Sequence, residues 1–101
     1  MAKRKSKRSR RHGFGLTPIE HAEEAKKWFA SASKIVSTAD RVAKRNQCGA
    51  IEHYTDAIAE GTVASVQARQ AMETKTESAA DALVRRATRS QRTAVRFCRL
   101  S

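Results

Sequence analysis

Five arginines recur near the C-terminus at spacings of four, three, four and three: Arg85, Arg89, Arg92, Arg96 and Arg99. At about 100° per residue, these spacings place all five side chains within roughly 40° of one line on an α-helix. The row spans about 21 Å at a rise of about 1.5 Å per residue. Because a planar guanidinium holds phosphate oxygens at two points, the row predicts a surface that binds several phosphates.

A second interpretation pairs these arginines with acidic side chains of the same protein. An antiparallel neighbouring helix would bring three acids beside the C-terminal end of the row: Glu52, Asp56 and Glu60. Ion pairs with them would neutralise about half of the row and leave an ordinary solvated helix face or a protein interface. The sequence leaves both interpretations open.

A second basic segment lies at the N-terminus. Residues 1–12 contain no acid and seven cations: Lys3, Arg4, Lys5, Lys7, Arg8, Arg10 and Arg11. Such a segment gains free energy by releasing counterions from DNA or RNA, with a salt slope of about 0.9 per phosphate. No aromatic side chains alternate with the cations, so we expect contacts to the nucleic-acid backbone without base recognition. A nuclear-localisation signal and an anionic membrane surface are the competing roles for this segment.

Charge is distributed unevenly along the chain. Residues 1–19 carry a net charge of +7, residues 20–81 carry −2, and residues 82–101 carry +6, within a total of +11. A nearly neutral centre between two basic ends is suited to a polyanionic partner. The charge pattern therefore supports nucleic-acid binding at both ends of the chain.

The sequence gives no support for enzymatic chemistry. His21 and His53 have no nucleophile in a recognisable arrangement, and no glycine-rich phosphate loop occurs. We therefore expect a non-enzymatic protein with no catalytic residue and no cofactor. Cys48, His53 and Cys98 would supply three metal ligands at one end of a bundle, but no fourth ligand is evident, so we expect no metal site.

Two cysteines are too few for a disulfide framework. We expect Cys48 and Cys98 to be separate small apolar side chains in preference to a disulfide. Such cysteines favour an intracellular location (the cytoplasm or the nucleoid) or the inside of a virus particle, and not secretion. No apolar run reaches 18 residues and no apolar segment follows the basic start, so we expect neither a membrane span nor a secretory signal.

The composition predicts an all-α protein, because alanine is abundant and alternating strand patterns are absent. We expect a disordered basic arm and hinge over residues 1–16 and a helical domain over residues 17–101. The helices should cover about 18–46, 50–73 and 79–99. They would form a long antiparallel hairpin or a three-helix bundle.

Capping and periodicity locate the helices. Thr17, Pro18 and Glu20 form a start signal for the first helix, and Ser78 with Asp81 predicts a capping box for the third. Three seven-residue series give the first helix a wide apolar face: Ala22, Phe29, Val36 and Ala43; Trp28, Ile35 and Val42; Ala25, Ala32 and Ala39. The remaining core positions that we expect are Ile51, Tyr54, Ile58, Gly61, Ser65, Ala68 and Met72 on the second helix, and Ala80, Leu83, Ala87, Ala94 and Cys98 on the third.

We expect small residues of the second helix to face large residues of the first. Folding the chain back at residues 47–49 would place three small residues, Gly61, Ser65 and Ala68, opposite Trp28 and Phe29. Glycine costs about 1 kcal/mol in a helix interior, and close packing of this kind would offset that cost.

These features predict a small nucleic-acid-binding structural protein that neutralises phosphates without reading sequence. The arrangement of a folded module with a basic arm favours a genome-packaging component inside a virus particle over a ribosomal or nucleoid protein. The alternative is an assembly adaptor of a capsid, ribosome or nucleoid, whose helices bind other protein subunits, including a second copy of this chain. The wide apolar face of the first helix supports that alternative.

Overall fold

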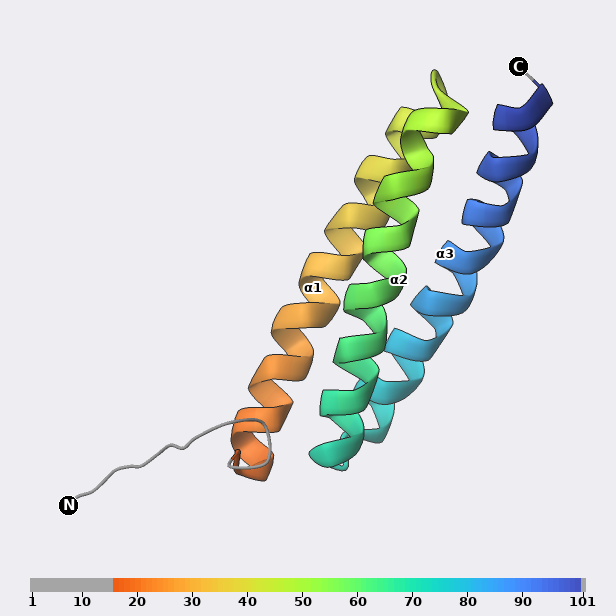
Figure 1. Ribbon diagram of the computed structural model, residues 1–101. Coiled ribbons are helices and arrows are strands. Elements are labelled where there is room, and N and C mark those ends of the chain that lie inside the picture. Colours follow the sequence, from red (N-terminus) through yellow and green to blue (C-terminus); the bar gives the residue numbers. More distant parts are fainter. Residues whose placement is uncertain (1–15, 101) are drawn as a thin grey trace.

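The computed structural model describes residues 16–100, which form three antiparallel α-helices (Figure 1). They are α1 (Pro18–Ala43), α2 (Gln47–Gln70) and α3 (Thr74–Leu100). α2 packs along both neighbours, whereas α1 and α3 touch at few places. The predicted all-α class is confirmed, and of the two architectures the three-helix bundle is found. Residues 1–15 of the predicted arm lie outside the described residues.

Side-chain caps fix the start of the first two helices. The Thr17 hydroxyl accepts a hydrogen bond from the Glu20 N–H (3.2 Å), and the Glu20 carboxylate accepts one from the Thr17 N–H (2.9 Å), which confirms the capping box. Asn46 accepts from the Gly49 N–H (2.9 Å) and caps α2. α1 therefore ends at Ala43, three residues before the expected position, because Asn46 begins the next helix.

The turn between α2 and α3 is shorter than expected. Met72 adopts a positive φ of 58°, the Met72 N–H donates to the Arg69 carbonyl (3.1 Å), and the Glu73 N–H donates to the Ala68 carbonyl (2.9 Å). This is the Schellman arrangement, in which glycine usually occupies the left-handed position. Because the turn needs so few residues, α3 begins at Thr74 and not at residue 79.

A seam of alanines holds the helices together. Nine alanines at intervals of seven residues are 0% exposed: Ala25, Ala32 and Ala39 on α1; Ala50, Ala57 and Ala64 on α2; Ala80, Ala87 and Ala94 on α3. A methyl group at each crossing lets neighbouring backbones approach closely. The expected apolar positions Ile51 and Ile58 are half-buried beside this seam, and Met72 is exposed in the turn.

The environment of Gly61 differs from the one we expected. A methyl group added at Gly61 would lie 2.8 Å from Cγ2 of Val84 on α3 and 4.0 Å from Cβ of Ala32 on α1. Gly61 therefore faces the space where α3 crosses α2, and Trp28 and Phe29 are half-buried elsewhere on α1. The predicted opposition of Gly61 to these two aromatic residues is wrong, because Ala32 occupies the facing position on α1.

Gly61→Ala tests the closeness of this crossing. Alanine gains about 1 kcal/mol in helix propensity. The new methyl meets a valine that holds one preferred side-chain rotamer in a helix, and overpacking costs about 1–3 kcal/mol. We expect a net loss of about 1 kcal/mol in the free energy of unfolding, measured by denaturant titration.

Val84→Ala supplies the matched background, because it removes the atom that the new methyl would meet. In that background Gly61→Ala should stabilise the protein by up to about 1 kcal/mol. An equal effect of Gly61→Ala in both backgrounds would show that the crossing is looser than described.

Candidate nucleic-acid interface

The five predicted arginines lie on the outer face of α3, and each is exposed: Arg85, Arg89, Arg92, Arg96 and Arg99. We call this row the arginine stripe. Ala80, Ala87 and Ala94 lie buried on the opposite face of α3, about 160° from the stripe at about 100° per residue. The alanine seam thus turns the stripe toward solvent.

None of the five arginines forms an ion pair within residues 16–100, where the three ion pairs are Lys27–Glu24, Arg69–Glu77 and Arg86–Asp40. The alternative pairing with Glu52, Asp56 and Glu60 is therefore not formed. Glu60 instead accepts a hydrogen bond from Ser31 of α1.

The rotation of α2 explains this result. The side chains of Thr55, Ser65 and Arg69 on α2 form hydrogen bonds to side chains of α3. At about 100° per residue, Glu52 and Asp56 lie about 60° and 100° around the helix from Thr55, on the side away from Ser65 and Arg69. The stripe arginines are consequently without an ion-pair partner among the described acidic side chains of α2.

The surface along the stripe is shallow and strongly cationic. Val84, Arg85, Thr88, Arg89 and Arg92 line an open hollow beside it. Further along, Cζ of Arg96 lies 6.0 Å from the ring centroid of Phe97. Three guanidinium groups around an apolar wall and a hydroxyl suit phosphate oxygens, because arginine can hold such oxygens at two points.

One cation of α3 lies away from the stripe and ties the three helices together. Arg86 donates to Asp40 of α1 at 2.6 Å, and the Tyr54 hydroxyl of α2 donates to the other oxygen of the same carboxylate. Sequence reasoning missed this cluster. The sequence held two signals for it. Arg86 directly follows Arg85 and so does not fit the spacing of the stripe, and Tyr54 is a large residue among small ones, whose hydroxyl needs a hydrogen-bond partner when it is buried.

This cluster changes the titration of two groups. Burial by itself raises the pKa of Asp40, but hydrogen bonds from Tyr54 and Arg86, with the charges of Arg86 and Lys44, outweigh burial and lower the pKa below its usual value. Burial and the hydrogen bond to Asp40 raise the pKa of Tyr54 above its usual value. Both groups therefore hold the protonation states that the cluster requires at neutral pH.

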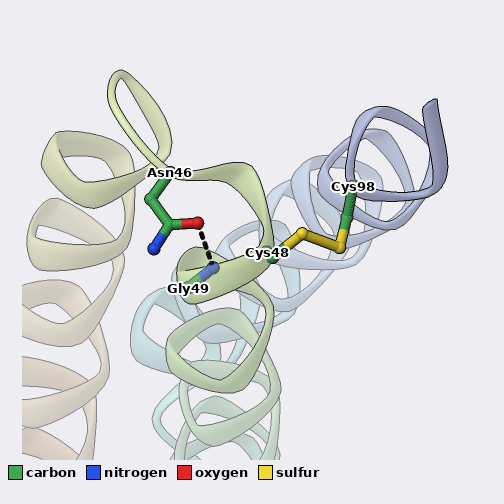
Figure 2. Close-up of a disulfide and its surroundings, with 4 residues drawn as sticks. All are labelled: Asn46, Cys48, Gly49 and Cys98. Carbon is green, nitrogen blue, oxygen red and sulfur yellow. Dashed lines mark hydrogen bonds between the residues drawn. A yellow bond between two sulfur atoms is a disulfide. The ribbon is translucent and has the colours of Figure 1, made fainter. Parts of the chain in front are cut away.

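The cysteines correct our expectation. Cys48 and Cys98 form a disulfide between the first turn of α2 and the last turn of α3, with their Cα atoms 4.8 Å apart (Figure 2). The expectation of two separate cysteines is wrong, and the cysteine count no longer indicates a reducing compartment. The disulfide also uses the sulfur atoms that a metal site with His53 would need. In the chain-entropy model, closing 50 residues stabilises a fold by about 4 kcal/mol.

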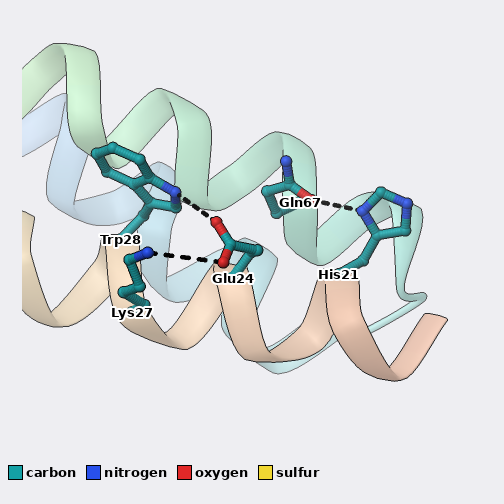
Figure 3. A network of polar contacts seen from close by, with 5 residues as sticks. All are labelled: His21, Glu24, Lys27, Trp28 and Gln67. Carbon is teal, nitrogen blue, oxygen red and sulfur yellow. Dashed lines mark hydrogen bonds and ion pairs between the residues drawn. The ribbon is translucent and has the colours of Figure 1, made fainter. Parts of the chain in front are cut away.

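The polar groups near the start of α1 have structural partners (Figure 3). His21 Nδ1 lies 2.5 Å from the amide oxygen of Gln67 on α2. Glu24 accepts from the Trp28 indole (3.1 Å) and lies 3.7 Å from Lys27. Within the described chain no group of three or more His, Cys, Asp or Glu side chains is placed to hold a metal ion.

Two further sequence predictions concern the N-terminal cations and membrane-spanning helices. The seven cations of the N-terminal segment lie outside the described residues, so the structure brings none of them to the stripe. None of the three described helices is long and apolar enough to cross a membrane.

Asp40→Asn tests the three-helix cluster. The folded pKa of Asp40 lies below its unfolded value of about 3.9, so the stability it contributes is complete above that value and is lost as pH falls through the folded value. Asp40→Asn should lower the melting temperature at pH 7, and the difference from the native chain should shrink below about pH 4. Asp56→Asn, on an exposed residue without an ion pair in residues 16–100, is the control and should change little at either pH. A native-minus-variant difference for Asp40→Asn that is as large in acid as at pH 7 would contradict the assignment.

Comparison with known proteins returned no match: no family model, no curated protein and no solved structure matches this chain.

Proposed function

We propose that this protein is a non-enzymatic structural protein that binds DNA or RNA by neutralising backbone phosphates, without reading the base sequence. The observation that carries the proposal is the arginine stripe: five exposed arginines in one line of about 21 Å, with no ion pair within residues 16–100. A helix that carries unpaired cations along one side matches the regular negative charge of a nucleic-acid backbone.

The side chains around the stripe support binding without sequence recognition. Contacts to phosphates position a protein on nucleic acid but carry no base information. Base recognition commonly uses asparagine or glutamine, and Gln91 is the one such residue on α3. Its amide donates to Thr55 of α2 at 2.7 Å and so points away from the stripe.

The N-terminal segment supports the same function through charge alone. Its seven cations and the five of the stripe provide two basic regions at the two ends of the sequence. In this proposal the bundle docks on a protein assembly while both regions contact the polyanion. We propose genome packaging inside a virus particle as the setting, since such proteins bridge a shell and its genome.

Replacing stripe arginines tests the proposal. Arg85, Arg89 and Arg92 changed together to Gln remove the three cations that line the hollow. Affinity for a labelled mixed-sequence duplex should fall, and the slope of log K against log salt should become shallower by about 2.7, or about 0.9 per lost phosphate contact. Fluorescence anisotropy from about 50 to 200 mM salt measures both quantities.

The matched control removes the same charge from α1. Lys26, Lys34 and Arg41, also exposed, are changed together to Gln, and the salt slope should stay unchanged. Equal losses for both triple variants would mean that net charge, and not the stripe, governs binding. A chain shortened to Gly13–Ser101 separates the contribution of the N-terminal segment, since it keeps the stripe and lacks all seven cations.

A second candidate function is assembly with other protein subunits, and the outer face of α2 favours it. Val63 and Val66 are 37% and 43% exposed on this face, one helical turn apart. If this face binds a second copy, the native chain should sediment as a dimer at high concentration, and Val63→Ser with Val66→Ser should return it to a monomer. A compact monomer at every concentration would exclude the self-associating form of this candidate.

A further inference from the structure

We propose that the Cys48–Cys98 disulfide is a thiol-exchange site that holds the C-terminal third of α3, residues 92–100, against α2, and that thiol reductants release this segment. Because this segment carries three arginines of the stripe, reduction would weaken nucleic-acid binding; this consequence rests on the proposed function.

The two ends of α3 are attached differently. At its N-terminal end the Schellman turn joins it to α2, and Arg69–Glu77 and Ser65–Asp81 bond across the helices at 2.9 and 2.6 Å. At its C-terminal end the disulfide joins it to the first turn of α2 (Figure 2). α3 is thus covalently connected to α2 at both ends, through the turn at its N-terminal end and through the disulfide at its C-terminal end.

Packing between these attachments becomes sparse toward the C-terminus. Gln91 bonds to Thr55 at 2.7 Å. Beyond Gln91, no polar side chain of the described part of α3 bonds to α1 or α2. In this last portion Ala94 is buried and Val95 and Cys98 are half-buried, while Phe97 and Leu100 are 46% and 75% exposed. The disulfide therefore carries most of the attachment here.

Charge destabilises the helical conformation of the same portion. Arg92, Arg96 and Arg99 follow one another at spacings of four and three residues, so neighbouring guanidinium groups repel on one side of the helix. Like charges at such spacings destabilise a helix by a few tenths of a kcal/mol per pair. Without the covalent link, the packing of a few apolar side chains, chiefly Ala94 and the half-buried Val95, is left to oppose this repulsion and the conformational entropy of the chain end.

The disulfide is accessible to a small thiol, because Cys48 is exposed and Cys98 is half-buried. A thiolate of the reductant attacks the Cys98 sulfur, the S–S bond breaks, and the Cys48 sulfur leaves as a thiolate. The start of α2 stabilises that thiolate, since helix N-termini favour negative charge. A second reductant thiol then displaces Cys98, so two thiols are oxidised to a disulfide while the protein gains two electrons and two protons.

Hydrogen exchange of the full chain tests the release directly. Backbone amides of residues 92–100 should exchange at least about tenfold faster after treatment with dithiothreitol, and their loss of protection should exceed that of α1, α2 and residues 74–87, which lose protection only through the lower global stability of the reduced chain. Cys48→Ser with Cys98→Ser should reproduce the reduced pattern without reductant and show no response to it. Unchanged protection of residues 92–100, or an equal loss of protection over all three helices, would overturn the proposal.

Anisotropy with the same duplex separates the local release from its consequence. The oxidised chain should bind about tenfold more tightly than the reduced chain, because a fixed stripe avoids the cost of ordering it on binding. Equal affinity of both forms, with faster exchange in residues 92–100, would overturn the regulatory consequence. Absence of binding by the oxidised chain would instead refute the proposed function, whereas the exchange result would still decide the release.

Discussion

Close approach of helices through alanine is the constraint on which the rest of this structure depends. Nine alanines at seven-residue intervals are fully buried, and no large side chain is buried to the same degree in the described chain. Each methyl removes little apolar area from water, so this core stabilises the fold less than a leucine core of equal length. The bundle consequently relies on ties beside the seam. These are the Asp40 carboxylate shared by three helices and the Cys48–Cys98 disulfide.

The close packing of the helices through alanine also determines where the arginine stripe lies. Because the inner face of α3 is made of alanines, its opposite face is turned outward and presents the stripe. The hydrogen bond from Arg86 to Asp40 favours the same rotation of α3 about its axis, since it requires Arg86 to face α1. A rotation by one residue, about 100°, would bury stripe arginines against α1 or α2 without partners.

Sequence patterns predicted the parts of the fold with strong local signals. The capping box at Thr17 and the stripe spacing depend on neighbours within one or two turns, and α1 begins where it was expected. The seam on α2 was missed because Ala50, Ala57 and Ala64 carry a weak hydrophobic signal beside Ile51 and Ile58. The turn was missed because a methionine in the left-handed conformation gives no glycine signal.

The position of that turn decides which residues meet. Four bonded pairs between α2 and α3 are equidistant in sequence from residue 73: Arg69–Glu77, Ser65–Asp81, Thr55–Gln91 and Cys48–Cys98. Helices expected at 50–73 and 79–99 would centre the pairing near residue 76 and bring Cys98 level with residue 54. A shift of about three residues in the centre of the turn therefore decides whether Cys48 and Cys98 lie close enough to form a disulfide or remain apart. Contacts between residues this far apart in the sequence depend on the position of the turn and cannot be predicted from the local sequence pattern of either helix.

The acidic side chains by which α3 bonds to α2 and the arginines of the stripe lie in different parts of the helix. Its acidic residues Glu77 and Asp81 bond to α2 near the turn, and the described helix has no acid beyond Asp81. The most cationic portion of α3 is thus the portion that has the fewest polar bonds to the other described helices. Intramolecular acids would have stabilised this portion but would also have neutralised the stripe, so the two demands exclude each other at the same side chains. A covalent link resolves the conflict, because it holds the helix end without using any charge.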